Sequence, residues 1–285
     1  MVYKAGILFE GGGMRGAYTS GVIDALLENN IICDKCYGVS SGACHATNYI
    51  SQQAGRSLRV TTTFIGDERY CSAKSLFKTG NFFGLEMIYE TIPRELDKFD
   101  FETARNSPTK LYACATNVKT GKMDYLLVGD LYEKSEYMKI AASMALPFLA
   151  KICKIDGEKY LDGGVADSLP VKRTLAEGND KLILVLTQAK PFHKKFNWLT
   201  PLVALKYLFY PKYTASFATR HIRYNESLAC IDELEKEGKV FVIRPQKPVE
   251  LKRLEVDGKK IRDLYDIGYR EATELIPALR KYLEE

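Results

Sequence analysis

Several features are missing from this sequence of 285 residues, and each absence excludes a class of protein. No stretch contains about 18 uninterrupted apolar residues, so no membrane-spanning helix is expected. Lys and Arg do not gather into long blocks, so we expect no nucleic-acid partner. Linkers rich in Gly, Ser or Pro and internal repeats are also absent. One domain covering residues 1–285 is therefore the simplest organisation.

The start of the chain lacks the charged region and cleavage site of a secretory signal peptide, and seven cysteines are an odd number. Together these features predict a reducing, cytoplasmic location. Cys33 and Cys36 have CxxC spacing, but no second pair stands at the distance of a zinc site, so we expect no metal. The net charge of +5 is spread along the chain and mildly favours an anionic membrane surface.

What the chain does contain is an alternation of strand and helix signals. Hydrophobic runs and helical periodicity indicate a strand at 4–10, a helix at 14–30, a strand at 36–40 and a helix at 41–53. Such a βαβ unit makes the two strands parallel, and a parallel sheet is covered on both faces. We therefore predict a three-layer α/β/α fold with a mainly parallel central sheet.

The remaining elements are assigned more coarsely. Residues 55–110 show mixed signals and receive no assignment. Beyond them we predict a hairpin at 110–128, a helix at 133–150 ending near Pro147, a hairpin around Asp156-Gly157, strands at 180–188 and 239–245, and helices at 221–238 and 260–285.

A glycine-rich loop follows the first strand. Gly11, Gly13 and Gly16 match G-x-G-x-x-G, the pattern of dinucleotide-binding folds. Asp34 lies near the place of a ribose-binding acid, but it precedes the second strand instead of ending it. The same glycines expose backbone N–H groups at a helix N-terminus, where phosphate or an oxyanion binds, and Arg15 adds positive charge. From this motif alone both uses remain open.

A second motif follows the second strand. Gly38-x-Ser40-x-Gly42 is the spacing of a nucleophile elbow, in which small neighbours allow the serine to occupy a sharp strand-to-helix turn. Ser41 then occupies the first helical position. We expect its backbone N–H to complete an oxyanion hole and its hydroxyl to cap the helix.

The base for Ser40 is less evident, because the chain contains only three histidines. His45 lies inside the following helix, and we expect it to face neither Ser40 nor the glycine loop. His193 and His221 lie in basic segments away from predicted strand ends. A conventional Ser-acid-His triad would need one of these two, and that alternative stays open.

A carboxylate acting directly is the other choice. Asp162 precedes Gly163 and Gly164, and two glycines after an acid allow another chain segment to approach closely. Asp167 is a neighbouring competitor without flanking glycines. A purely structural turn is the plain alternative for this triplet.

Taken in order, "GGGMRG", "GVSSG" and "DGG" resemble the motifs of the patatin-like phospholipase family, and "ASMALP" and "LPVKRTLAEG" are also similar to it. The resemblance covers residues 5–190, whereas 191–285 reads as generic strand and helices completing the domain. It implies acyl-ester hydrolysis of phospholipids or related lipids by a serine–aspartate dyad, without a cofactor. The residues that it implicates are Ser40 as nucleophile, Asp162 as base, Gly11, Gly12, Gly13, Arg15 and Ser41 at the oxyanion, and the motif glycines Gly16, Gly38, Gly42, Gly163 and Gly164.

One further segment bears on the substrate. Residues 192–212 place Trp198 and several leucines among lysines, which suits a membrane surface or a lid over a lipid pocket. A core helix with solvated lysines is the alternative that we favour for this segment. For the whole chain, a nucleotide-binding protein and a catalytically silent lipid-surface module remain the competing functions.

Overall fold

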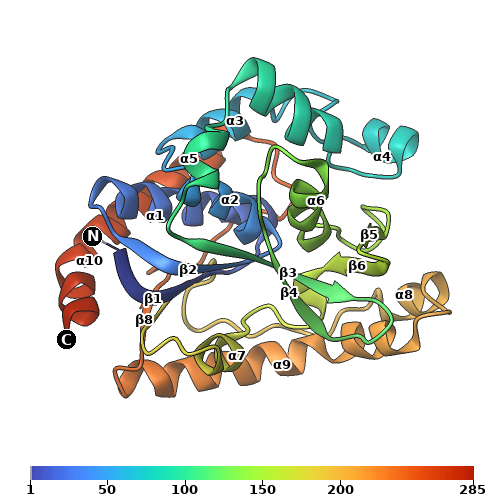
Figure 1. The fold of residues 1–285 in the computed structure, drawn as a ribbon. Helices are drawn as coiled ribbons and strands as arrows, with labels where there is room; N and C mark the ends of the chain where they lie inside the picture. Colours follow the sequence, from blue (N-terminus) through green and yellow to red (C-terminus); the bar gives the residue numbers. More distant parts are fainter. Residues whose placement is uncertain (1) are drawn as a thin grey trace.

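The computed structural model describes residues 2–285 and has a central eight-stranded sheet between helices (Figure 1). The strand order is β5-β6-β3-β2-β1-β7-β8, and β4 pairs with β3. The strands are β1 (Val2–Phe9), β2 (Ile32–Val39), β3 (Lys110–Asn117), β4 (Met123–Leu127), β5 (Cys153–Ile155), β6 (Glu158–Asp162), β7 (Leu182–Val185) and β8 (Val240–Ile243).

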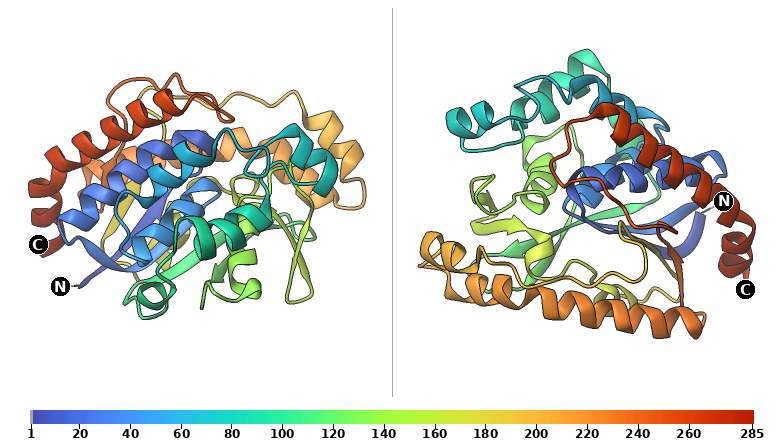
Figure 2. Two further views of the ribbon diagram at one scale, coloured as in Figure 1. Left: turned by 90° about the horizontal axis from the view of Figure 1, so that it is seen from above. Right: turned by 180° about the vertical axis from the view of Figure 1, so that it is seen from behind.

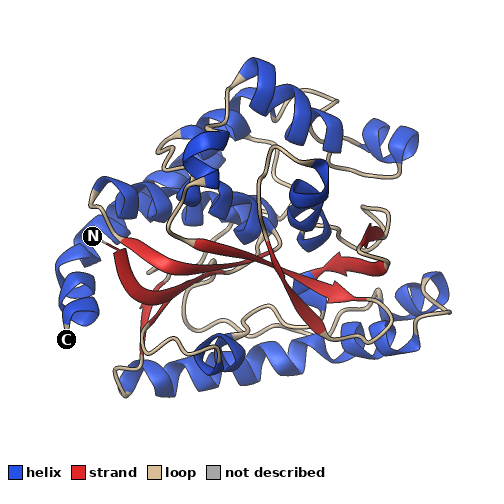
Figure 3. Ribbon diagram, in the orientation of Figure 1, coloured by secondary structure: helices blue, strands red, loops and turns tan. Residues whose placement is uncertain are grey.

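Helices connect these strands and cover both faces of the sheet (Figure 3). The α-helices are α1 (Gly16–Glu28), α2 (Ser41–Ile50), α3 (Arg56–Phe64), α4 (Ala73–Thr79), α5 (Phe101–Arg105), α6 (Lys134–Ser143), α7 (Val171–Ala176), α8 (Thr200–Lys206), α9 (Pro211–Lys236) and α10 (Gly258–Glu284). Two 3₁₀ turns, η1 (Gly13–Arg15) and η3 (Gly163–Val165), and a π-helix, η2 (Met87–Leu96), complete the list. Within residues 2–285, every helix is too short or too polar to span a bilayer.

The sheet is parallel through its centre and antiparallel at one side. Strands β3, β2, β1, β7 and β8 pair in parallel, whereas β4 and β6 pair antiparallel to β3. The hairpin β5–β6 turns at Asp156 and Gly157, whose φ angles of 49° and 80° are those of a tight two-residue turn. The mainly parallel sheet and both hairpins are thus confirmed.

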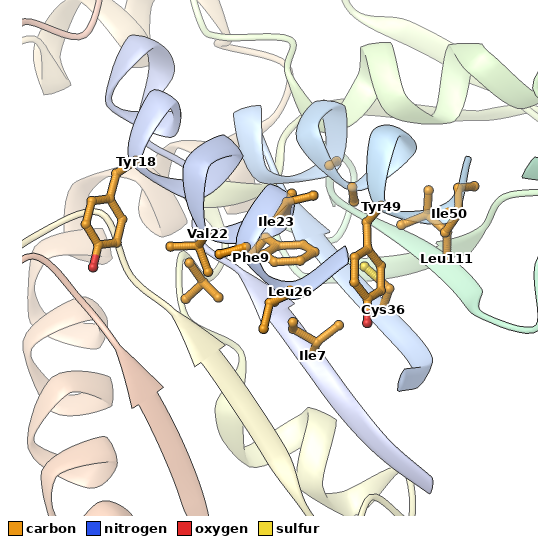
Figure 4. Packing of buried hydrophobic residues seen from close by; sticks show 14 of the residues in the cluster. Ile7, Phe9, Tyr18, Val22, Ile23, Leu26, Cys36, Tyr49, Ile50 and Leu111 are labelled. Atoms are coloured by element: carbon orange, nitrogen blue, oxygen red, sulfur yellow. The ribbon is translucent and has the colours of Figure 1, made fainter. Parts of the chain in front are cut away.

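Alternating side chains of β1 divide the core into two layers. Ile7 and Phe9 pack against α1 and α2, with Leu26 and Tyr49 among their neighbours (Figure 4). Leu8 points to the other face and joins the cluster that contains Tyr224 of α9. Because side chains alternate along a strand, one apolar run supplies both layers. The predicted three-layer α/β/α fold is confirmed.

The last helix packs along the first one (Figure 2). Two glycines allow this close approach, because a Cβ at Gly268 would collide with the carbonyl of Tyr18, and one at Gly21 with the carbonyl of Tyr265. Tyr18 also donates a hydrogen bond to Glu271 across the interface at 2.9 Å. The C-terminal helix therefore packs directly onto the helix that follows the glycine-rich loop.

The structure differs from the sequence-based expectation at several element bounds. Strand β2 begins at Ile32, four residues before the predicted start, α6 ends at Ser143, before the predicted end near Pro147, and α9 begins at Pro211, ten residues before the predicted helix. The unassigned stretch 55–110 holds α3, α4, η2 and α5, which lie above the sheet in Figure 1. Short helices of this kind carry little periodic signal, and Pro93 interrupts the pattern of η2.

The core-helix expectation for residues 192–212 is wrong. Trp198, Leu205 and Phe209 expose 86%, 74% and 89% of their surface, and Leu202 and Leu208 also face solvent. Helix α8 spans seven residues of this segment and buries only Val203. The lysines are not uniformly solvated either, because Lys194 is half-buried next to the ring of Tyr224.

Candidate active site

Three chain turns meet at one end of the sheet. The glycine-rich loop follows β1, Ser40 follows β2, and Asp162 is the last residue of β6. Strands β1 and β2 run in parallel with Phe9 opposite Gly38, so the turns that follow them start from the same end of the sheet. Asp162 lies opposite Ala115 on β3, the neighbour of β2. The carboxyl ends of parallel strands are where α/β proteins usually place their sites.

Ser40 occupies a strained backbone conformation at this edge. Its φ of 55° and ψ of −127° fall where residues other than glycine are rare. The flanking glycines make the turn possible, because a Cβ at Gly38 would collide with the backbone of Ala43, and one at Gly42 with the carbonyl of Phe9. This is the local geometry of a serine presented at a sharp strand-to-helix turn.

A buried serine, Ser143, stabilises this turn by two hydrogen bonds. Ser143, at the end of α6, accepts a hydrogen bond from the backbone N–H of Ser40 at 2.9 Å and donates one to the carbonyl of Cys114 at 2.6 Å. Its side chain is fully buried. Ser143 therefore joins the elbow to strand β3 and fixes the position of Ser40.

Asp162 accepts a hydrogen bond from the hydroxyl of Ser40. The distance from Ser40 Oγ to Asp162 Oδ2 is 2.5 Å, and Oδ1 accepts from the N–H of Gly164 at 2.9 Å. Only 2% of Asp162 is exposed. Burial raises the pKa of Asp162, although the bond from Ser40 and the positive charge of Arg220 act in the opposite direction. A carboxylate with a raised pKa is a better proton acceptor at neutral pH.

The glycine that follows Asp162 allows the close approach predicted for this triplet. A Cβ at Gly163 would collide with the carbonyl of Cys114 on β3. Thr116 of the same strand donates to the carbonyl of Asp162 at 2.7 Å. These contacts hold the aspartate against the strand next to β2, within reach of Ser40.

The glycine-rich loop is tied to the elbow by Ser41. The N–H of Gly12 donates to Ser41 Oγ at 2.9 Å, so the expectation that this hydroxyl caps α2 is wrong. Gly13 has φ of 60°, and a Cβ there would collide with the carbonyl of Arg253. Gly13 and Ser41 each begin a helical turn, where backbone N–H groups lack helical partners. Backbone N–H groups at the start of a helical turn are the kind of group that can bind an anion.

His45 does not lie where the sequence suggested. Its ring packs against Gly16, at the end of the glycine-rich loop, and lines a pocket together with Ser40, so the expectation that it faces neither was wrong. Its Nδ1 bonds to Ser57 Oγ at 2.6 Å. Burial lowers the pKa of His45 to about 4, which keeps the ring neutral at pH 7. The hydroxyl of Ser40 bonds to Asp162 and not to this ring.

The other candidate residues lie away from Ser40. His193 is exposed, and His221 packs edge-on against Phe196 with ring centroids 5.5 Å apart. Asp167 accepts from the N–H of Leu169. Asp34 lies near the beginning of β2 and accepts a hydrogen bond from the N–H of Ala5. It is therefore at the end of the strands opposite to the glycine-rich loop. A ribose-binding role for Asp34 does not fit this position.

The cysteine pair is structural. Cys33 and Cys36 are free and buried in β2, and burial raises the pKa of Cys33 to about 12. A thiol held neutral in this way is a weak nucleophile and a poor metal ligand. In the described part of the chain, no cluster of three or more His, Cys, Asp or Glu side chains is arranged to hold a metal ion.

Two pockets meet at Ser40, Gly13 and Leu146. The larger one has a volume of about 1120 Å³, including its opening, and its lining is mostly apolar and aromatic. Much of this wall comes from the segment that the sequence left unassigned: Val60 of α3, Ile88, Tyr89 and Ile92 of η2, Phe99, and Phe101 of α5. Apolar walls of this kind suit a hydrocarbon chain.

The smaller pocket, of about 530 Å³, has a more polar lining than the larger one. Glu10, which follows β1, accepts from the hydroxyl of Tyr224 at 2.7 Å and from the N–H of Thr187 at 2.6 Å. These two bonds join the start of the glycine-rich loop to α9 and to the segment after β7. Four basic residues line the pocket, namely Arg15, Lys194, Arg220 and Arg253. Sequence reasoning singled out Arg15 and missed the role of the other three, because tertiary contacts alone bring them together.

A strained serine bonded to a buried carboxylate beside an apolar pocket is an arrangement that a serine hydrolase can use. Comparison with known families agrees with this class. The family model for patatin-like phospholipase matches residues 7–175, and the family model for a domain of unknown function, DUF6363, matches residues 210–284. The chain belongs to the patatin-like phospholipase family. Membership of this family supports a lipid hydrolase activity.

Individual relatives are distant. The chain is 24% identical to "Uncharacterized protein YjjU" of Escherichia coli, over 99% of this chain and 80% of that protein. It is 27% identical to "Lysophospholipase nte1" of Aspergillus terreus, over 64% of this chain and only 12% of that protein. The crystal structure of VipD from Legionella pneumophila is 14% identical with a TM-score of 0.46, over 97% of this chain and 67% of that one.

Proposed function

We propose that the protein is a serine acyl hydrolase that cleaves acyl esters of phospholipids or related lipids, with Ser40 as nucleophile and Asp162 as base. The observation that carries this proposal is the 2.5 Å hydrogen bond from Ser40 Oγ to a carboxylate oxygen that is almost completely buried. Family membership and the apolar pocket beside Ser40 support a lipid substrate.

The chemistry follows from the positions of these atoms. Ser40 Oγ attacks the ester carbon as its proton passes to Asp162, and the carbonyl electrons move onto the oxygen. Collapse of this intermediate expels the alcohol, which takes the proton from Asp162. Water, deprotonated by Asp162, then attacks the acyl-serine, and Asp162 returns this proton to Ser40 Oγ as the fatty acid leaves.

The oxyanion is the second requirement. In our proposal the N–H groups of Gly13 and Ser41 receive it, and Arg15 lies close by. Gly11 leaves room for the serine, because a Cβ there would come within 2.6 Å of Ser40 Cβ. The N–H of Gly12 is engaged by Ser41 Oγ, so we assign Gly12 to holding the loop in place. One such donor is worth about 2.7 to 4 kcal/mol in other hydrolases, which compensates for a weak base.

We further propose that the protein acts in the cytoplasm, at a membrane surface. All seven cysteines of the described chain are free, as expected in a reducing compartment. The exposed apolar residues of 192–212 lie among Lys195, Lys206 and Lys212. Apolar side chains with a basic border suit an anionic lipid interface.

The dyad is tested with p-nitrophenyl esters of short and medium acyl chains. Ser40→Ala and Asp162→Asn should each lower kcat by on the order of 10³-fold or more, since each removes a group needed for the acyl transfer. His45→Ala should keep most of the activity, because His45 makes no bond to Ser40. Thermal unfolding checks that each variant is folded. An inactive wild type, or a fully active Asp162→Asn, would reject the mechanism and leave the loop as a binding site.

A further inference from the structure

The polar pocket beside Ser40 carries an unusual charge distribution. Its four basic residues come from distant parts of the chain: Arg15 from the glycine-rich loop, Lys194 from the segment after β7, Arg220 from α9, and Arg253 from the loop before α10. Two carboxylates, Glu10 and Asp162, also line it. Basic groups therefore outnumber acidic groups by two (four minus two).

Neither carboxylate neutralises this cluster by a direct ion pair. The oxygens of Asp162 accept from Ser40 and Gly164, and those of Glu10 accept from Thr187 and Tyr224. Throughout residues 2–285, the salt bridges within 4.0 Å involve none of the four basic side chains. The positive charge of the pocket is therefore available to an anion.

Burial makes this excess positive charge costly. The Nε atoms of Arg15 and Arg220 are enclosed, and neither has a hydrogen-bond partner in the described chain. Lys194 Nζ lies 3.7 Å from the centre of the Tyr224 ring and donates to Ser168 Oγ at 3.2 Å. Burial, and then the like charge of Arg220, lower the pKa of Lys194 well below its usual range. Removing unpaired cations from water is energetically unfavourable, and a bound anion would offset that cost.

The pocket lies where the alcohol part of an ester would extend. It shares Ser40, Gly13 and Leu146 with the apolar pocket, so an ester carbonyl at Ser40 can direct its acyl chain into one and its alcohol into the other. Farther out, Lys194, Arg220 and Arg253 also border a surface hollow lined by Phe196, Trp198 and Leu199. An apolar rim around a cationic pocket favours a lipid as the source of the anion.

We propose that Lys194, Arg220 and Arg253 form a head-group subsite for a phosphate monoester, so that the preferred substrate is a monoacyl glycerol phosphate. The inference rests on the proposed function and adds the chemical class of the leaving alcohol. A dianionic phosphate can pair with several of these groups at once. A choline cap would bring a cation into the same cluster, where both carboxylates are already hydrogen-bonded and the face of Tyr224 is covered by Lys194.

The head-group preference is tested by the hydrolysis of three substrates that carry the same acyl chain. These are oleoyl glycerol 3-phosphate, oleoyl glycerophosphocholine and oleoyl glycerol, each compared by kcat/KM. Wild type should favour the phosphate monoester, and Lys194→Gln or Arg253→Gln should reduce its advantage over oleoyl glycerol roughly tenfold to a hundredfold. Arg262→Gln removes one exposed charge on α10 and is the matched control, for which the ratio stays unchanged. Equal or better use of the phosphocholine lipid would overturn the assignment, even if Ser40-dependent hydrolysis holds.

Direct binding separates this inference from the proposed function. Calorimetry measures the binding of glycerol 3-phosphate and of inorganic phosphate to wild type and to Ser40→Ala. This measurement needs no turnover. Glycerol 3-phosphate should bind both proteins, more tightly than inorganic phosphate, and Lys194→Gln should weaken it. Absence of binding overturns the subsite. Equal affinity for the two anions would also overturn it, by showing a site for free phosphate in place of a lipid head group.

Discussion

At the scale of single residues, Ser40 depends on groups that the chain supplies from far away. Its carboxylate partner, Asp162, lies 122 residues later in the chain. Ser143, which accepts from its backbone N–H, lies 103 residues later. The glycine spacing around Ser40 and the Asp162-Gly163-Gly164 triplet were visible in the sequence, because tight turns demand glycine locally. Ser143 had no such local signal, since its role arises only when α6 packs under the elbow.

Ser143 provides the prediction at this scale. Ser143→Ala should lower kcat roughly tenfold with little change in KM, because the N–H of Ser40 and the carbonyl of Cys114 both lose their partner and the nucleophile shifts. The free energy of unfolding should fall by about 1 to 3 kcal/mol for the same reason. Steady-state kinetics with a p-nitrophenyl ester and denaturant unfolding measure the two effects.

Ser20→Ala is the matched control. Ser20 is equally buried, but its hydroxyl bonds to Ala17 within α1 and away from Ser40. It should lose some stability and keep its kcat. If Ser143→Ala lost stability and retained full kcat, Ser143 would be only a structural residue.

At the scale of elements, strands and pockets differ in how far the sequence predicts them. The buried strands and the hairpins carry local signals in apolar runs and turn residues, and those predictions are confirmed. The apolar pocket wall comes from α3, η2 and α5, which the sequence left unassigned. Short helices and a π-helix with an internal proline have no regular period, and their positions depend on packing above the sheet.

The wall formed by α3 gives a prediction about acyl chain length. Val60→Trp adds an indole to the apolar pocket and should reduce kcat/KM for decanoyl relative to butyryl esters at least about tenfold, because the longer chain loses apolar contact. Thr63→Trp, on the exposed side of the same helix, should leave the ratio unchanged. A parallel loss for both esters with Val60→Trp would mean that the acyl chain lies elsewhere.

At the scale of the whole molecule, the C-terminal third contributes directly to the site. The sequence there read as generic strand and helices, yet Lys194, Arg220 and Arg253 line the pocket beside Ser40. Helix α10 packs along α1, and the carbonyl of Arg253 accepts from the N–H of Met14 at 3.0 Å. We propose that residues 2–285 fold as one unit, although separate family models match 7–175 and 210–284.

The exposed apolar residues of 192–212 predict membrane attachment. Replacing Trp198, Leu205 and Phe209 by serine should weaken binding to vesicles with anionic lipid at least about tenfold, since each buried side chain contributes about 1.5 to 3 kcal/mol. Val2→Ser is the control and should bind normally, because Val2 is exposed at the start of β1, next to the N-terminus, which lies at the opposite side of Figure 1 from α8. Flotation or sedimentation measures the bound fraction. Unchanged binding of the triple variant would reject this surface.

The most direct test of the central claim is mass spectrometry after treatment with a fluorophosphonate, which reacts with activated serines. The account predicts one adduct, on Ser40, that forms rapidly in wild type, slowly in Asp162→Asn and at nearly the wild-type rate in His45→Ala. Absence of an adduct, an adduct on Ser41, or equal rates for wild type and Asp162→Asn would contradict a nucleophile at Ser40 activated by Asp162.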